Sequence, residues 1–282
     1  MAKGNLLLGT AGNSVGDVVM YRREGAQVSR VRVRKVKNPK TAAQSTQRAF
    51  FAPVAKFYSP LSIVLERSYE GLSKSKSYSK FLKTNVDLAR QNDWLLPKGT
   101  GFFPLPYKLS SGSLPMVNYT MSSNTGFSIS VPGIADAPTT IGALSQIFVN
   151  LGYSIGSIVT IICAFGTVPG GFYPKAWQFE IDVNSDTTIA TALPGLTFSV
   201  PAPGSGSLAV STGSNSNLAA VGLIVATFKN DVWRRSSQNF DVLSTILTDI
   251  AATNFKAAAI ASYGATNTGD NPLVYLDGEE LV

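Results

Sequence analysis

The chain has 282 residues, of which 44% are hydrophobic and only 15% are charged, and its net charge is +7. This length supports one large domain or two ordinary ones, and so low a charged fraction favours a surface of small polar residues or one covered by partners. The chain has no histidine and a single cysteine, Cys163. This excludes histidine-based catalysis, histidine-ligated zinc, four-cysteine metal clusters and internal disulfides, and Cys163 lies in an apolar run where a thiol is expected to be buried and unreactive.

The first residues give no sign of export. Residues 1–8 hold one lysine and three leucines, too few apolar residues for the core of a signal peptide. No apolar run approaches the roughly 20 residues that a helix needs to cross a bilayer. We therefore expect a chain that is made in the host cytoplasm and has no membrane span.

The first 40 residues are predicted to form a basic β-hairpin. Two extended runs, residues 17–22 and 27–36, flank a Glu24-Gly25 turn. In the second run valines alternate with arginines, so the valines share one face of the strand and the arginines share the other. The glycine-rich stretch 9–17 lacks the Gly-Lys-Ser/Thr ending of a phosphate-binding loop, and we expect it to form a tight approach to the hairpin.

Helices are predicted directly after the hairpin. Asn38-Pro39 is typical of a helix start, and Thr41–Gln44 matches a capping box, in which the threonine side chain accepts a hydrogen bond from the backbone three residues on. Apolar residues then recur every three or four positions over Phe50–Leu65. Two prolines interrupt this pattern, which predicts a kinked helix or two short helices. A further helix is expected over 77–93.

After residue 96 the composition becomes that of a linker followed by a β domain. Residues 97–115 are rich in Pro, Gly and Ser, and their aromatic side chains are expected to hold this linker against a surface. Seven short apolar runs follow with turn residues between them, which is typical of an antiparallel sandwich. These runs are 126–131, 145–151, 157–166, 176–183, 196–200, 207–212 and 219–228. Residues 239–255 fit a strand or a helix, and 256–264 fit a last strand.

These elements predict an α+β, mainly β chain with four parts. Residues 1–96 form a basic β-hairpin and helical module, 97–115 a linker, 116–264 an antiparallel immunoglobulin-like (Ig-like) β-sandwich, and 265–282 an acidic C-terminal tail. Most lysines and arginines precede Lys98, whereas the closing LDGEELV is acidic. This asymmetry favours contact with a polyanion or complementary packing between subunits, and a solvated charged face is the alternative.

The opening segment resembles a family of uncharacterised proteins from Bacteroidetes and their phages. Members share a glycine-led GKVG-x-V turn, a hairpin, an NP-x-T-x-A-Q step into a helix, and then an arginine and an aromatic residue. Residues 13–16, 38–44, Arg48 and Phe50 carry this pattern here, with Asn-Ser in place of the Gly-Lys of the turn. Members also end in an Ig-like β-domain, introduced by a segment similar to 107–115. The resemblance implies a phage-associated structural component.

The basic segment is the main candidate for a binding site. We expect it to contact neighbouring subunits or the phosphate backbone of DNA or RNA, because arginines on every second residue of a strand lie about 6.6 Å apart and meet phosphates without reading sequence. The residues are Arg22, Arg23, Arg30, Arg32, Arg34, Lys35, Lys37, Lys40 and Arg48. Nearby aromatics over 50–58 are candidate stacking platforms for single strands, although helix-spaced aromatics more often belong to a core.

Two further sets of residues are candidates in the β domain. Trp233, Arg234 and Arg235 form a candidate subunit anchor, because Trp and Arg are favoured at the centres of interfaces. A tryptophan buried in the sandwich core is the alternative. Glu180 and Asp182 alternate on one strand, where two carboxylates suit calcium binding or glycoside chemistry, or simply form the solvent face of the strand.

The sequence thus favours a non-enzymatic structural or assembly protein, expected as a component of a bacteriophage virion. Its basic N-terminal module is expected to contact other copies, other virion proteins or packaged nucleic acid, with no cofactor and no metal. Two alternatives remain open. One is a free protein that binds nucleic acid without sequence specificity, and the other is an adhesin whose sandwich domain binds carbohydrate.

Overall fold

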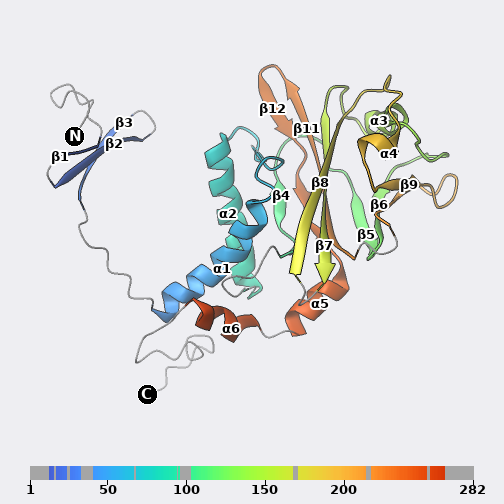
Figure 1. Cartoon of the computed structure of the whole chain (residues 1–282). Helices are drawn as coiled ribbons and strands as arrows, with labels where there is room; N and C mark the ends of the chain where they lie inside the picture. Colours follow the sequence, from blue (N-terminus) through green and yellow to red (C-terminus); the bar gives the residue numbers. More distant parts are fainter. Residues whose placement is uncertain are drawn as a thin grey trace. The chain divides into compact units, whose positions relative to one another are not determined.

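The chain is an α+β protein made of helices and antiparallel sheets (Figure 1). The computed structural model describes residues 13–15, 17–23, 26–32, 41–66, 68–93, 95, 103–167, 171–213, 217–252 and 255–263. Contacts within the chain divide it into two compact units, residues 1–39 and 40–282. This division differs from the expected ranges 1–96 and 116–264, because the helices after residue 40 share a hydrophobic core with the β domain.

The first unit is a small antiparallel sheet. It contains β1 (Asn13–Val15), β2 (Val18–Arg23) and β3 (Ala26–Val31), in the order β1-β2-β3. The predicted hairpin is confirmed, since β2 pairs with β3 from Val18 opposite Val31 to Arg23 opposite Ala26. None of the side chains described in this sheet is buried. The sheet therefore has no core of its own among its described residues.

Two helices open the second unit, as the sequence predicts. In α1 (Ala42–Tyr58) the Thr41 Oγ1 accepts a hydrogen bond from the Gln44 N–H at 3.3 Å, which confirms the predicted cap. The helix continues through Pro53 and ends before Pro60, so it is one helix rather than two. The second helix is α2 (Lys74–Gln91). No helix in the described part of the chain is both long and apolar enough to cross a membrane.

Two sheets and a short strand pair make up the β part of the second unit. The central sheet has the order β12-β11-β7-β8, with β14 also paired to β11, and the second sheet has the order β5-β6-β10-β9. The central strands are β7 (Ile158–Thr167), β8 (Gly171–Glu180), β11 (Leu218–Lys229), β12 (Val232–Arg235) and β14 (Asp241–Val242). The second sheet contains β5 (Tyr119–Ser123), β6 (Gly126–Ser130), β9 (Thr197–Ser199) and β10 (Ser207–Ser211), and β4 (Lys108–Ser110) pairs with β13 (Gln238–Asn239).

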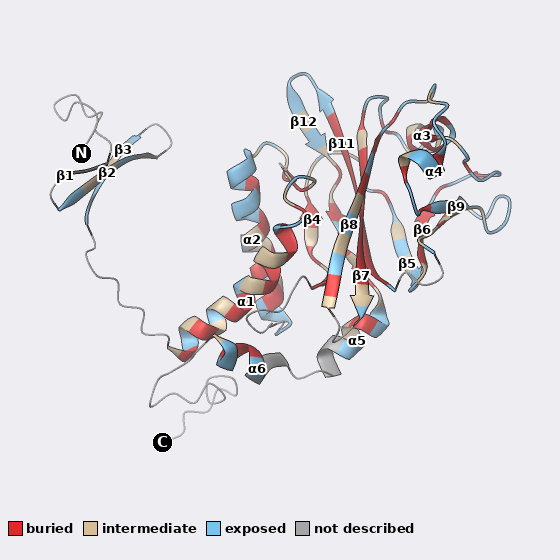
Figure 2. Ribbon diagram, in the orientation of Figure 1, coloured by how far each residue is buried: buried red, intermediate tan, exposed pale blue. Residues whose placement is uncertain are grey.

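The central sheet is buried on both faces, as Figure 2 shows for β7 and β11. Successive side chains of a strand point to opposite faces. Ile162 and Ala164 of β7 join the core that contains α1 and α2. Ile161 and Cys163 join a second core with the β5-β6-β10-β9 sheet. Burial raises the pKa of the Cys163 thiol far above its ordinary value, which agrees with an unreactive thiol.

Two segments predicted as strands are helices. Residues 145–151 belong largely to α3 (Ile141–Asn150), where Ile141, Leu144 and Phe148 are buried at helical spacing and the Thr140 Oγ1 accepts from the Ala143 N–H. The prediction of a strand was wrong because so short an apolar run fits both the two-residue period of a strand and the 3.6-residue period of a helix. Residues 256–264 belong mainly to α6 (Phe255–Ser262), where alanines favour a helix.

Two more helices complete the fold. They are α4 (Ile189–Ala192) and α5 (Ser244–Ala252), and α5 settles the ambiguity of residues 239–255 in favour of a short strand, β14, followed by a helix.

The segment expected as a linker is part of the core where the structure describes it. Phe103 and Tyr107 are buried, so aromatic side chains do hold this stretch in place. Tyr107 lies in an aromatic cluster, with its ring centre 4.5 Å from that of Phe57. The buried Asn85 of α2 holds the next residue, because its side-chain amide donates to the Lys108 carbonyl at 3.1 Å and accepts from the Lys108 N–H at 2.8 Å.

Replacing the Asn85 amide is expected to loosen this connection. Asn85→Ala leaves the partly buried Lys108 N–H without its acceptor, and we expect the free energy of unfolding to fall by about 1 to 3 kcal/mol. Urea denaturation measures the change. The control is Asn92→Ala, since Asn92 donates only an exposed hydrogen bond to Leu88 and its loss is expected to change stability by less than about 0.5 kcal/mol. Equal effects of the two variants would contradict the assigned role.

The Tyr107 hydroxyl is buried and has no hydrogen-bond partner among the described residues. Burial raises the pKa of this phenol far above its ordinary value. Because an unpartnered buried hydroxyl is costly, Tyr107→Phe is expected to raise the free energy of unfolding by about 1 kcal/mol in the same urea assay. Tyr78→Phe, which removes a hydroxyl from a partly exposed ring, is the control and is expected to be neutral. A loss of stability in Tyr107→Phe would contradict this account.

Candidate functional site

The basic hairpin presents two different faces. Register places Val18 opposite Val31 on one face and Val19 opposite Arg30 on the other, so the predicted separation of valine from arginine holds at Arg30 and Val31. Val31 is 73% exposed, which is unusual for a β-branched side chain in a strand. The Val18–Val31 pair is therefore an exposed apolar patch on the first face, next to Met20 and Ser29, and Arg30 lies on the second face beside Val19 and Val28.

An aromatic ring lies among the charges of the second face. The Arg30 guanidinium lies 5.9 Å from the centre of the Tyr21 ring, within the range of a cation–π interaction. Tyr21 is itself 39% exposed. The Arg32 N–H donates to the Asp17 carbonyl at 2.5 Å, which holds the exposed Arg32 beside the start of β2.

The structure places only part of the predicted basic set. Arg22 and Arg23 lie at the end of β2, and Arg30 and Arg32 are exposed on or beside β3. Arg48 lies on α1, in the other compact unit. The remaining members lie outside the described residues: Arg34, Lys35, Lys37 and Lys40. Of the helix-borne aromatics, Phe50 and Tyr58 are buried in the core and Phe51 is 42% exposed.

The predicted anchor residues lie on β12, at the edge of the central sheet. Trp233 is half-buried and packs on Phe228 with ring centres 5.1 Å apart, rather than lying in the sandwich core. The Arg235 guanidinium lies 5.5 Å from the centre of the Trp233 ring and donates to the Glu66 carbonyl at 2.9 Å. Arg234 is exposed. The structure thus brings Trp233 and Arg235 together and leaves Arg234 facing solvent.

A tight turn extends β11 and β12 beyond their neighbours. β11 pairs with β7 only as far as Ala226 opposite Ile158, and the hairpin continues past that point. Asn230 and Asp231 both have positive φ, of 53° and 58°, as a two-residue hairpin turn of this hand requires. The exposed Phe228 lies near this end. The Asn-Asp pair between apolar runs is the signal from which this hairpin was predictable.

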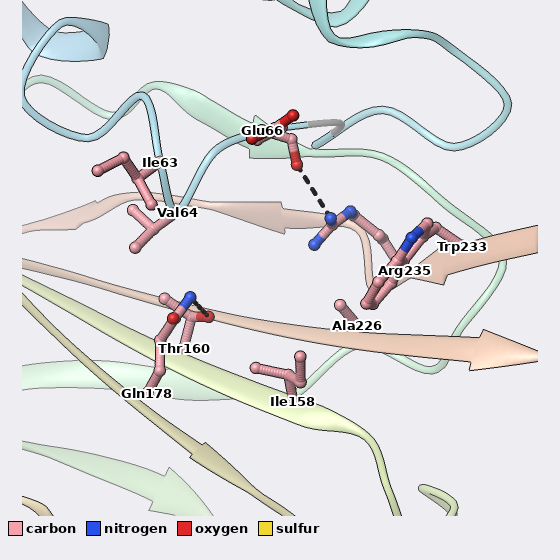
Figure 3. Close-up of a pocket in the computed structure, with 9 residues that line it drawn as sticks. All are labelled: Ile63, Val64, Glu66, Ile158, Thr160, Gln178, Ala226, Trp233 and Arg235. Atoms are coloured by element: carbon pink, nitrogen blue, oxygen red, sulfur yellow. Dashed lines mark hydrogen bonds between the residues drawn. The ribbon is translucent and has the colours of Figure 1, made fainter.

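A groove of about 270 Å³ runs beside this hairpin, across the helix-side face of the central sheet (Figure 3). Ala226, Ile158, Thr160 and Gln178 form its floor, and the Gln178 Nε2 donates to the Thr160 Oγ1 at 3.0 Å. Its sides come from the turns after α1 and from β12: Ile63, Val64, Glu66, Trp233 and Arg235. The groove therefore combines an aliphatic wall, an amide and an arginine held over an indole ring.

Glu70 holds the rim of this region by accepting several hydrogen bonds. Its Oε2 accepts from the Ser113 N–H at 2.7 Å and from the Arg235 N–H at 3.4 Å, and the Ser113 hydroxyl donates to both carboxylate oxygens at 3.0 Å. Burial alone would raise the pKa of this carboxyl, but these hydrogen bonds and the charge of Arg234 outweigh it and lower the pKa below its ordinary value of 4.5. The ionised Glu70 thus ties the 111–114 loop to β12.

The candidate carboxylates lie at the opposite edge of the central sheet. Glu180 and Asp182 are exposed and line a second hollow of about 590 Å³ together with Ile155. The Asp182 Oδ1 accepts from the Asn184 N–H at 3.0 Å, so it closes a local turn. No group of three or more acidic, histidine or cysteine side chains that could hold a metal ion occurs in the described ranges.

An aromatic hollow of about 230 Å³ lies on β8, on the face turned toward the second sheet. Tyr173 is 60% exposed and its ring lies 5.6 Å from that of Phe165. The Lys175 ammonium lies 4.7 Å from the centre of the Trp177 ring. This cluster could not be predicted from local sequence patterns, because the aromatic residues on β7 and β8 come together only when those strands pair.

Comparisons with known proteins add no assignment. No family model matches the chain, and neither a curated protein nor a solved structure matches it. The candidate sites therefore stand on their geometry alone.

Removing the charge of Glu70 is expected to change how stability depends on pH. Glu70→Gln keeps the shape of the side chain but removes the carboxylate. Folding lowers the pKa of Glu70, so the ionised carboxylate contributes fully to the free energy of unfolding above pH 4.5. This contribution disappears as the pH falls through the pKa that Glu70 has in the folded protein. Urea denaturation at pH 7, 5 and 3 should show the variant less stable than wild type at pH 7, with the gap closing toward pH 3.

The control for this titration is Asp136→Asn, at an exposed carboxylate in a loop. Its stability is expected to follow that of the wild type at each pH. A Glu70→Gln gap that stays constant or widens toward pH 3 would contradict a stabilising ionised carboxylate.

Proposed function

We propose that this chain is a non-enzymatic structural protein of a bacteriophage virion or a similar repeating assembly. Its basic N-terminal sheet meets neighbouring subunits or packaged nucleic acid. The observation that carries this proposal is the absence of any buried side chain among the described residues of the first unit. Isolated small sheets are at best marginally stable in water, so a face such as that of Val18 and Val31 gains stability when another surface covers it.

The two faces of the sheet suit two kinds of contact. The face of Val18 and Val31 suits apolar packing against protein. The face of Arg30, Arg32 and Tyr21 suits phosphates, because arginine forms bidentate hydrogen bonds with phosphate oxygens and an aromatic ring stacks on bases. Such contacts neutralise charge without reading sequence, as packaging requires.

We further infer that the β part of the second unit is an Ig-like sandwich. This inference is supported by two antiparallel sheets, β5-β6-β10-β9 and β12-β11-β7-β8, whose side chains share one core. A rigid sandwich suits a repeating assembly because it presents its edges and loops in fixed positions.

One observation favours a second candidate function. The exposed ring of Tyr173, with Lys175 nearby, provides the flat apolar surface and the hydrogen-bond donor that a sugar ring needs. This supports the adhesin alternative, in which the sandwich binds carbohydrate. An adhesin of this kind would lose glycan binding in Tyr173→Ala and keep it when the hairpin arginines are changed.

The proposal is tested by removing charge from the hairpin. The variant with both Arg30→Gln and Arg32→Gln is compared with wild type for binding to single- and double-stranded DNA at several salt concentrations, and for assembly by light scattering. Each neutralised phosphate adds about 0.9 to the slope of log affinity against log salt. If the face meets nucleic acid, the double variant is expected to lower the magnitude of this slope by about 2. If it meets protein, the variant is expected to lose assembly instead.

The matched control removes two positive charges from the other unit. Lys80 and Lys83 are exposed on α2, and Lys80→Gln with Lys83→Gln is expected to leave the salt slope and the assembly as in wild type. If the hairpin variant behaves like this control in both assays, the arginines are only solvated and the proposal is wrong.

A further inference from the structure

The helix-side face of the central sheet carries opposite charges at its two edges. Register places Arg235, Ala226, Ile158 and Glu180 in one row across the four strands. The row begins on β12 with an arginine and ends on β8 with a carboxylate. Since neighbouring strands lie about 4.8 Å apart, the two charged residues are separated by roughly 14 Å.

Between these charges the row itself is apolar, with Ala226 and Ile158, and the groove beside it also holds the polar Thr160 and Gln178. Ile158 is half-buried on the floor of the groove, and Ile63 at its rim is 83% exposed (Figure 3). Ile155, beside Glu180 in the neighbouring hollow, is 62% exposed, and Phe228 on the β11–β12 hairpin is 54% exposed. Apolar side chains that gather on a surface in this way mark a site of contact with protein.

We propose that the open part of this face, around the groove, pairs with the same surface of a second copy around a two-fold axis. In such an interface each contact occurs twice, because the two copies exchange the same surface. A face with an arginine at one edge, an apolar centre and a carboxylate at the other edge becomes complementary to itself after a half turn. Arg235 of each copy then lies against Glu180 of the other, and the apolar centres cover one another.

The arginine is already held in position for this contact. Its bond to the Glu66 carbonyl and its place over the Trp233 ring restrict the guanidinium, so less conformational entropy is lost when the interface forms. Trp and Arg are also the residues that most often dominate interface energies. This inference rests on the proposed assembly function and names the chain's own copy as one partner.

Charge reversal tests the pairing on the full chain by sedimentation velocity. Wild type is expected to form a dimer. Glu180→Arg faces the partner's Arg235 with a second cation, and Arg235→Glu faces the partner's Glu180 with a second carboxylate, so each variant alone is expected to lose the dimer. In a heterodimer of the two variants, a cation faces a carboxylate at both contacts, with the two charges exchanged at one of them. An equal mixture is therefore expected to form this heterodimer.

Two further variants keep the test decisive if Arg235→Glu fails to fold. Ile63→Asp places a charge on an exposed rim residue and is expected to lose the dimer, whereas Asp136→Lys reverses an exposed charge elsewhere and is expected to keep it. A monomeric wild type would overturn the pairing, as would a dimer that survives both Glu180→Arg and Ile63→Asp. The pairing would also be overturned if Glu180→Arg and Arg235→Glu both fold but form no heterodimer when mixed.

The outcome is independent of the test on the basic hairpin. The variant with Arg30→Gln and Arg32→Gln is expected to keep this dimer, because those residues belong to the other compact unit. The hairpin variant thus tests the proposed function, and the Glu180 and Ile63 variants separately test the two-fold pairing.

Discussion

The central sheet has to be covered on both faces, and this constraint positions the elements of residues 40–282. Its middle strands, β7 and β11, are buried along nearly their whole length. Side chains on one face, such as Ile162, pack under α1 and α2, while those on the other face, such as Ile161, pack against the β5-β6-β10-β9 sheet. The two edge strands receive less cover. There the structure has its grooves, its exposed aromatic side chains and its unequal charges.

The N-terminal sheet shows what happens without such cover. Its valines at positions 18 and 31 are exposed, and those at positions 19 and 28 are only half-buried. Hydrophobic burial is the main favourable term in folding, and a sheet that buries little surface gains little stability from its own residues. The second unit has two hydrophobic cores of its own, whereas the described side chains of the first unit form none.

Local patterns in the sequence predict the elements whose signals do not depend on distant residues. The alternation of Val and Arg predicts the hairpin, Thr41 and Gln44 predict the start of α1, and the long apolar runs predict β7 and β11. The pattern fails over 145–151 and 256–264, where a short apolar run fits both a strand and a helix and tertiary packing decides.

The candidate site is less accessible to such reasoning. Trp233 and Arg235 stand out by residue type, but the groove also needs Ile63 and Gln178, which come from distant parts of the chain. The opposed charges of Arg235 and Glu180 become meaningful only through the register of four strands. Positions of this kind follow from tertiary structure, and no local motif marks them.

Amide hydrogen exchange of residues 18–31 tests the central claim most directly. The experiment compares the free chain with the chain bound to DNA or assembled into its particle. If the N-terminal sheet depends on a partner, its amides exchange rapidly in the free chain and become protected in the complex, while those of β7 and β11 are protected in both. Equal, strong protection of residues 18–31 in the free and the bound chain would show that the sheet is stable alone, and would contradict the account.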